Sequence, residues 1–183
     1  MKKIDLDFHS QALVWIKDYP SLIYPAIDVI NQEVCTGLTI NSGEKRAALE
    51  IMLPVGSRVL YGLLGANFMP NNSGKFSLEV LVSTNSEAVF QQSIAAKLDK
   101  VRIGLPSEYS QSVIDGTLHS LDQKSRESLG SGVLRFDKAA HGEIGSSNKF
   151  FRKIAATVVQ LLMLDKASNE KEVTEIVKTY SLA

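Results

Sequence analysis

The fold of this 183-residue chain is decided by the stretch Ser131–Gln160, which reads SGVLRFDKAAHGEIGSSNKFFRKIAATVVQ. Its first part, Gly132–Ala139, has the composition of a strand, and a polar Gly/Ser turn follows it. Asn148–Leu164 then places apolar residues every three to four positions, which predicts an amphipathic helix. Ser146 or Ser147 is expected to cap that helix, because a serine oxygen satisfies free N–H groups of the first turn.

A second helix is predicted just before this stretch, in Gly104–Leu121, GLPSEYSQSVIDGTLHSL. Lys100–Leu105 is expected to be a short strand, and Pro106 suits the first turn of a helix, where its missing N–H costs nothing. The apolar face of the helix repeats at four-residue spacing through Tyr109, Val113, Thr117 and Leu121. The two segments together predict the order strand, helix, strand, helix.

The rest of the chain predicts further strands and three more helices. The expected strands cover residues 11–17, 46–53, 58–65 and 76–83, with a turn-rich loop at 67–75. The expected helices cover Ala26–Val34, Ser86–Leu98 and a final segment that starts with a capping box of Asn169 and Glu172. We therefore expect an α+β fold with a mixed or antiparallel sheet and helices packed on it.

The chain is predicted to form one domain over residues 1–183. The alternative is a subdivision into a strand-rich half, 1–84, and a helix-rich half, 85–183. One domain is favoured because no flexible linker separates the halves and each half alone would bury a marginal core.

Composition narrows the classes of partner. The chain carries 20 basic and 20 acidic residues, so it lacks the basic excess expected of a protein that binds duplex DNA. The single cysteine, Cys35, excludes an intramolecular disulfide and fits a reducing compartment. Acidic residues interrupt the N-terminal segment, and no apolar run is long enough to cross a membrane. We expect a cytoplasmic protein with no membrane partner.

Two motifs resemble domain IV of elongation factor G. GLPSEYSQSVIDG (Gly104–Gly116) is similar to a family segment that runs glycine, apolar residue, proline, acid and tyrosine into a helix. HGEIGSSNKFFRKIAA (His141–Ala156) resembles the family's tip loop, which leads through an acid, an apolar residue and paired serines into a helix. The resemblance covers residues 100–164. It implies a ribosomal protein S5 domain 2-like fold for the C-terminal half, with tip loops that approach RNA.

The chain departs from this family at several positions. Gly145 stands where the family has an aspartate before the paired serines, and the family's loop histidine aligns with Gly142, one position after His141. The predicted helix Ser86–Leu98 has no family counterpart. The phosphate-cradling motif GxxxxGK[ST] of a GTPase is absent from the sequence, so this chain does not drive a GTPase cycle by itself.

The strongest candidate site is the turn between the last strand of the resemblance and its helix. A Gly/Ser turn at a helix N-terminus presents free N–H groups and is an anion site in principle. Plain capping with a solvated basic face is the first interpretation, contact with RNA or a protein partner the second, and a nucleotide loop the third. The candidate RNA- or partner-contacting residues are His141, Glu143, Ser146, Ser147, Lys149, Arg152 and Lys153.

No catalytic constellation stands out. His9, His119 and His141 are too scattered to indicate a metal site, and no nucleophile elbow is present, so no catalytic residue, metal or cofactor is predicted. His141 with Glu143 is most simply a pair of solvated residues in a loop. Trp15, Tyr19 and Tyr24 are expected to pack in the core or on a face of the sheet, with an exposed aromatic surface as the alternative.

Three functions follow from these observations. The favoured one is a non-catalytic protein-binding module, because a recognisable scaffold occurs without a catalytic constellation. The alternative is an RNA- or ribosome-contacting domain that uses the basic start of the last helix of the resemblance. The weaker alternative is a small-molecule enzyme that binds phosphate at the Gly/Ser turn.

Overall fold

The computed structural model describes residues 1–6, 9–35, 43–85, 88–122, 125, 128–164 and 169–182. The strands are β1 (Lys2–Asp5), β2 (Gln11–Ile16), β3 (Asp28–Cys35), β4 (Lys45–Val55), β5 (Arg58–Pro70), β6 (Lys75–Val82), β7 (Val101–Ile103) and β8 (Gly132–Gly142). The helices are α1 (Ser107–Ser120), α3 (Asn148–Met163) and α4 (Glu170–Val177), followed by a π-helical turn, η1 (Lys178–Leu182).

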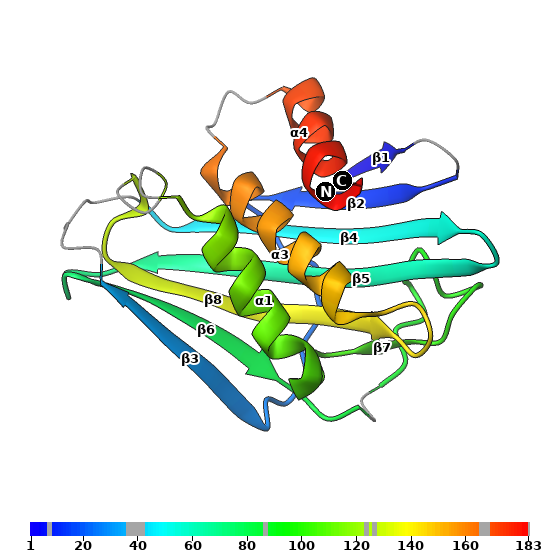
Figure 1. Cartoon of the computed structure of the whole chain (residues 1–183), viewed down its shortest axis with the longest axis horizontal. Coiled ribbons are helices and arrows are strands. Elements are labelled where there is room, and N and C mark those ends of the chain that lie inside the picture. Colours follow the sequence, from blue (N-terminus) through cyan, green and yellow to red (C-terminus); the bar gives the residue numbers. More distant parts are fainter. Residues whose placement is uncertain are drawn as a thin grey trace.

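All eight strands belong to one sheet in the order β1-β2-β4-β5-β8-β6-β3, and β7 pairs with the end of β8 (Figure 1). Neighbouring strands are antiparallel, except that β6 and β8 are parallel. The chain reaches this parallel pair by a crossover through α1, since parallel neighbours cannot be joined by a tight hairpin. The prediction of an α+β fold with a mixed sheet and helices packed on it is confirmed.

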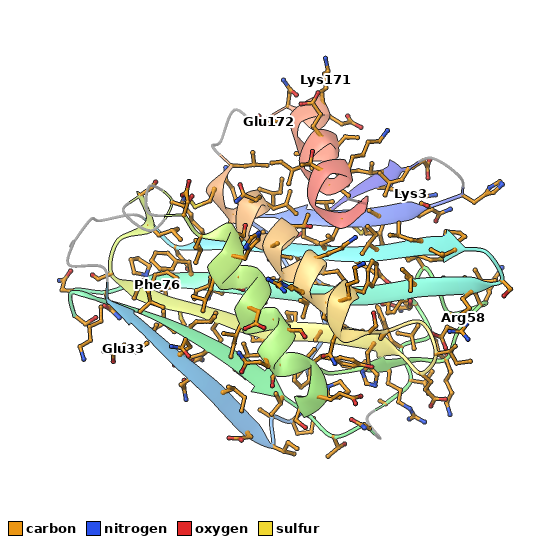
Figure 2. The ribbon with its side chains drawn as sticks, in the orientation of Figure 1. Lys3, Glu33, Arg58, Phe76, Lys171 and Glu172 are labelled. Carbon is orange, nitrogen blue, oxygen red and sulfur yellow. The ribbon has the colours of Figure 1, made fainter. Side chains whose placement is uncertain are left out.

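Side chains alternate between the two faces of each strand, and the apolar residues of one face point toward the helices. In β6, Phe76, Leu78 and Val80 are fully buried, while the residues between them are only partly buried. This set forms the main core with the apolar face of α3, which includes Phe151 and Ile154. Figure 2 shows Phe76 within the fold and the labelled charged side chains, such as those of Arg58 and Lys171, at its periphery.

Helices α1 and α3 lie side by side across this face of the sheet (Figure 1). Their contact runs along small residues of α1. The Ser112 hydroxyl donates to Asn148 Oδ1 (3.0 Å) and the Ser120 hydroxyl donates to the Ala156 carbonyl oxygen (3.1 Å). Between them, Gly116 meets the backbone of Arg152 so closely that a Cβ would collide with its carbonyl oxygen. The close approach fixes the register of the two helices.

The opposite face of the sheet carries a second, smaller core. Met52, Tyr61 and Leu63 of β4 and β5 pack there with residues from two irregular segments, among them Leu22 and Ala95. The central strands β4 and β5 are therefore buried on both faces, by helices on one side and by irregular chain on the other. Among the described residues, no helix is long and apolar enough to cross a membrane.

The prediction of a helix over Ala26–Val34 is wrong, because Asp28–Cys35 forms the edge strand β3. It pairs along its whole length with β6, from Asp28 opposite Val82 to Cys35 opposite Lys75. Its apolar residues Ile30 and Val34 lie four positions apart, and that spacing fits one face of a helix and one face of a strand equally well. Tertiary pairing selected the strand.

The prediction of a helix over Ser86–Leu98 is also wrong for the residues that the structure describes there. Residues 88–100 form turns and one isolated bridge, Val89 with Arg102. Ala95 is fully buried and Leu98 is exposed, so the segment follows the shape of the sheet rather than a helical repeat. Smaller differences concern bounds: β5 extends to Pro70, β4 continues through Pro54, and β1 had no counterpart among the expected strands.

Replacing Gly116 with alanine tests the close contact of the helices. We expect Gly116→Ala to lower the free energy of unfolding by about 1–3 kcal/mol, because the added methyl group overpacks α1 against the Arg152 carbonyl. Urea unfolding followed by circular dichroism measures the change. Asp115→Ala, at an exposed position of the same helix, is the control and should stay within about 0.5 kcal/mol of the wild type. Equal stability of G116A and wild type would contradict the packing described here.

Candidate functional site

The turn between β8 and α3 comprises Glu143–Ser147, and both of its serine side chains form hydrogen bonds within the protein. The Ser146 hydroxyl donates to the Tyr61 carbonyl oxygen (2.8 Å) and accepts from the Gly142 N–H (2.9 Å). The Ser147 hydroxyl accepts from the Phe150 N–H (3.3 Å), which makes it the N-cap of α3. The predicted cap is confirmed, and both hydroxyls have partners within the protein.

The N–H groups of this turn hold an anion that the chain supplies itself. The Asp99 carboxylate accepts from the Gly145 N–H (2.7 Å) and from the Ile144 N–H (3.3 Å). A Cβ at Gly142 or Gly145 would collide with this carboxylate, so both glycines are needed for its close approach. Successive N–H groups commonly form such anion-binding concavities. The sequence indicated an anion site only in principle, at the start of the helix, with plain capping as the first interpretation. Asp99 instead binds N–H groups of the turn that precedes the helix, and Ser147 caps the helix itself.

Glu143, the first residue of the turn, is an exposed carboxylate between two cations. Its Oε1 lies 2.7 Å from Arg102 Nε and 3.2 Å from Lys100 Nζ. Hydrogen bonding from Arg102, and then from Lys100, lowers the pKa of Glu143 below its ordinary value. The three side chains fasten the turn to β7.

His141 is not a loop residue. It lies in β8 and is buried, and its Nδ1 is 3.0 Å from the Gly104 carbonyl oxygen. Burial lowers the pKa of His141, and the hydrogen bond with Gly104 partly opposes that effect. The expectation that His141 and Glu143 form a solvated pair in a loop is therefore wrong for His141, although the side chain of Glu143 is exposed.

The basic residues at the start of α3 face outward to different degrees. Lys149 and Arg152 are exposed and Lys153 is half-buried. They lie within the first two turns of α3 after Ser147, at the same end of the helix as the turn. Their predicted contact with RNA or a partner stays a prediction. The structure places them beside Glu143–Ser147 and separates them from the buried His141.

A surface hollow of about 570 Å³ lies beside the same turn, between residues 89–101 and residues 143–144. Its apolar lining includes three side chains with large exposed fractions, Val89 (45%), Leu98 (62%) and Ile144 (77%). The other apolar lining residues are Phe90, Ala96 and Val101, and the charged lining residues are Lys97, Asp99, Lys100 and Glu143. Exposed apolar side chains gathered around a hollow commonly mark interaction sites.

Sequence reasoning did not identify this hollow. It placed Val89 and Leu98 within the predicted helix Ser86–Leu98, whereas residues 88–100 follow an irregular path in which both side chains are exposed. Ile144 appeared only as an apolar residue of the Gly/Ser turn. No local pattern in the sequence indicates the hollow, because the path of residues 88–100 depends on distant contacts such as the Ile94–Glu50 hydrogen bond.

The aromatic residues near the N-terminus pack rather than form an exposed surface. Trp15 and Tyr24 are buried, and the Tyr24 hydroxyl donates to the Leu81 carbonyl oxygen (3.1 Å). The ring of Tyr19 lies beneath two cations, with Arg46 Cζ 5.6 Å and Lys138 Nζ 5.5 Å from its centroid. Trp15 and Tyr24 are therefore buried as predicted, whereas Tyr19 is only half-buried.

Within the part of the chain that the structure describes, no group of three His, Cys, Asp or Glu side chains is placed to hold a metal ion. Comparison of the chain with protein-family models, with curated proteins and with solved structures finds no significant match. The geometry of the turn and the hollow is therefore the basis for any functional conclusion.

Replacing Asp99 with asparagine tests the internal anion. We expect Asp99→Asn to lower the free energy of unfolding by about 1–3 kcal/mol, because the neutral amide loses the charge that strengthens these hydrogen bonds and replaces one acceptor oxygen with an NH2 group. Urea unfolding measures the global effect, and hydrogen exchange at the Ile144 and Gly145 amides measures the local one. Asp115→Asn, on the exposed face of α1, is the matched control. Unchanged protection of both amides in D99N would rule out the role assigned to Asp99.

Proposed function

We propose that this protein is a non-catalytic binding module whose protein partner docks in the hollow lined by Val89, Leu98 and Ile144. The observation that carries the proposal is the exposure of these three apolar side chains around one cavity. Protein interfaces typically combine an apolar centre with a polar rim, and the hollow has both. A surface for RNA would instead present a continuous basic face.

The turn that carries Ile144 is held before any partner arrives. The Ile144 N–H is bonded to Asp99, and the Gly145 carbonyl oxygen accepts from the Tyr61 N–H (2.9 Å). Glu143 is tied to β7 through Arg102. Ile144 thus projects from a turn whose backbone is anchored to β5 and β7, so docking would order few additional groups and would cost little entropy.

The charges around the hollow indicate the chemistry of the partner. Both carboxylates of the rim have internal partners, Asp99 in the turn and Glu143 between Lys100 and Arg102. Lys97 is exposed and adds a further cation to the rim. We infer a partner segment that inserts a bulky apolar side chain into the hollow and carries an acidic residue next to it.

The scaffold is consistent with this role. We propose that the C-terminal half, from β7 through α3, has the ribosomal protein S5 domain 2-like fold implied by the resemblance to elongation factor G domain IV. In that comparison the Glu143–Ser147 turn corresponds to the contacting tip loop. The single cysteine, Cys35, fits a reducing compartment, and the proposal places the module in the cytoplasm.

An RNA- or ribosome-contacting role is the second candidate. Its specific support is that Lys149 and Arg152 are exposed at the start of α3, next to the tip turn. The phosphate-binding alternative has less support, because Asp99 already accepts from the N–H groups that would hold a phosphate.

Selection of peptides from a phage-displayed library against the purified protein tests the docking proposal. We expect recovered peptides to share a bulky apolar residue with a neighbouring acid. Leu98→Asp and Ile144→Asp should each weaken their binding at least tenfold, measured by isothermal titration calorimetry, because a charge would be placed in the apolar centre of the contact.

Ile23→Asp is the matched control, since Ile23 is an exposed isoleucine (86%) outside the hollow and its replacement should leave binding unchanged. Thermal melting of each variant confirms that it is folded. Peptides that bind L98D and I144D as well as the wild type would refute docking in the hollow. Salt-dependent binding to ribosomal RNA that is lost when Lys149, Arg152 and Lys153 become alanine would favour the second candidate instead.

A further inference from the structure

Glu50 is a carboxyl group in the middle of the smaller core. It lies in β4 on the face opposite the helices, only 1% exposed, near the apolar side chains of Met52 and Leu63. Its Oε1 accepts two hydrogen bonds, from the Tyr61 hydroxyl (2.8 Å) and from the Ile94 N–H (3.1 Å). One side chain of the sheet thereby holds the backbone of an irregular segment.

That segment, residues 88–100, forms one wall of the docking hollow. It contains no helix, and its N-terminal end is tied to β7 by two backbone hydrogen bonds, Phe90 N–H to the Val101 carbonyl oxygen (2.8 Å) and Ile103 N–H to the Ala88 carbonyl oxygen (2.9 Å). Its C-terminal end continues directly into β7. Its middle is held by the Ile94–Glu50 hydrogen bond and by the burial of Ala95. A segment with so little regular structure depends strongly on each such anchor.

The surroundings of Glu50 do not compensate a negative charge. Among the described residues, no lysine or arginine forms an ion pair with it. The groups that face it are Tyr61 from β5 and, from the segment, Ser93 and the Ile94 N–H. The Asp99 carboxylate interacts electrostatically with Tyr61, the neighbour of Glu50. Burial raises the pKa of Glu50 above its ordinary value, and hydrogen bonds from Tyr61, Ile94 and Ser93 partly oppose that effect.

We propose that Glu50 is a protonation-dependent latch, which holds residues 88–100 against the sheet while it is neutral and loosens them when it ionises. Val89 and Leu98 belong to this segment, so the latch sets whether the wall of the hollow is in place. The regulatory meaning of the latch rests on the proposed docking function. The loosening of residues 88–100 on ionisation of Glu50 is expected in the free protein, without any partner.

The direction of the pH effect follows from the raised pKa. In the open segment Glu50 is hydrated and ionises near the ordinary pKa of a glutamate side chain. In the closed segment its pKa is higher, so closure is most stable below the ordinary pKa and weakens as the pH rises toward the closed-state pKa. Between the two values the opening equilibrium constant rises by up to about tenfold per pH unit, and above them it is constant.

Hydrogen exchange at the Ile94 amide measures this opening directly. Protection factors, corrected for the intrinsic exchange rate, are recorded on the free protein between about pH 4 and pH 9, with the Leu64 amide of β5 as the reference for global unfolding. We expect protection of Ile94 to fall with rising pH by more than that of Leu64. In Glu50→Gln the amide side chain does not ionise, so the excess pH dependence should vanish.

Tyr61→Phe provides a second variant that keeps the ring in the core. It removes a hydrogen bond that favours the ionised carboxylate, so the pH range over which protection falls should extend upward. The latch is refuted if the Ile94 amide shows no excess pH dependence in the wild type, or if the same dependence persists in E50Q. No partner is present in this experiment, so such a result would not contradict the docking proposal. Conversely, if the Leu98 and Ile144 variants did not affect binding, the docking proposal would be refuted and the latch would not.

Discussion

Burial of the central strands on both faces is the constraint on which the rest of the structure depends. The middle of β4 and of β5 has almost no exposed side chain on either side. A sheet of this kind needs two apolar covers. Helices α1 and α3 provide the first, and they satisfy their own backbone hydrogen bonds. The second cover is irregular chain, whose backbone N–H groups must find acceptors elsewhere when they are buried.

Two carboxyl groups provide some of these hydrogen-bond acceptors. Glu50 accepts from the N–H of Ile94 on the covering segment, and Asp99, which belongs to the segment, accepts from the N–H groups of Ile144 and Gly145. The first links the segment to the sheet and the second links it to the turn before α3. Asp99, Ile144 and residues 89–91 and 96–101 line the hollow, so the segment that covers the second face also forms the candidate binding surface.

The strands and helices with strong local signals could be predicted from the sequence. Alternation over residues 76–83, the apolar stripe of α3 and the caps Ser147 and Asn169 are properties of short stretches of chain, and each occurs where it was expected. Two helices were predicted wrongly where the local pattern was ambiguous. Ile30 and Val34 fit either a helix or a strand, and only pairing with β6 made residues 28–35 a strand.

The candidate site was predictable in part. The sequence by itself determined that a Gly/Ser turn precedes a capped helix and that the free N–H groups there form an anion site in principle, because both follow from residue types within one short segment. Only the tertiary structure decided that the anion is Asp99, that His141 is buried, and that Val89, Leu98 and Ile144 meet around one hollow. The reason is physical: these contacts join residues some forty to fifty positions apart, and no local periodicity encodes which distant side chain reaches which backbone group.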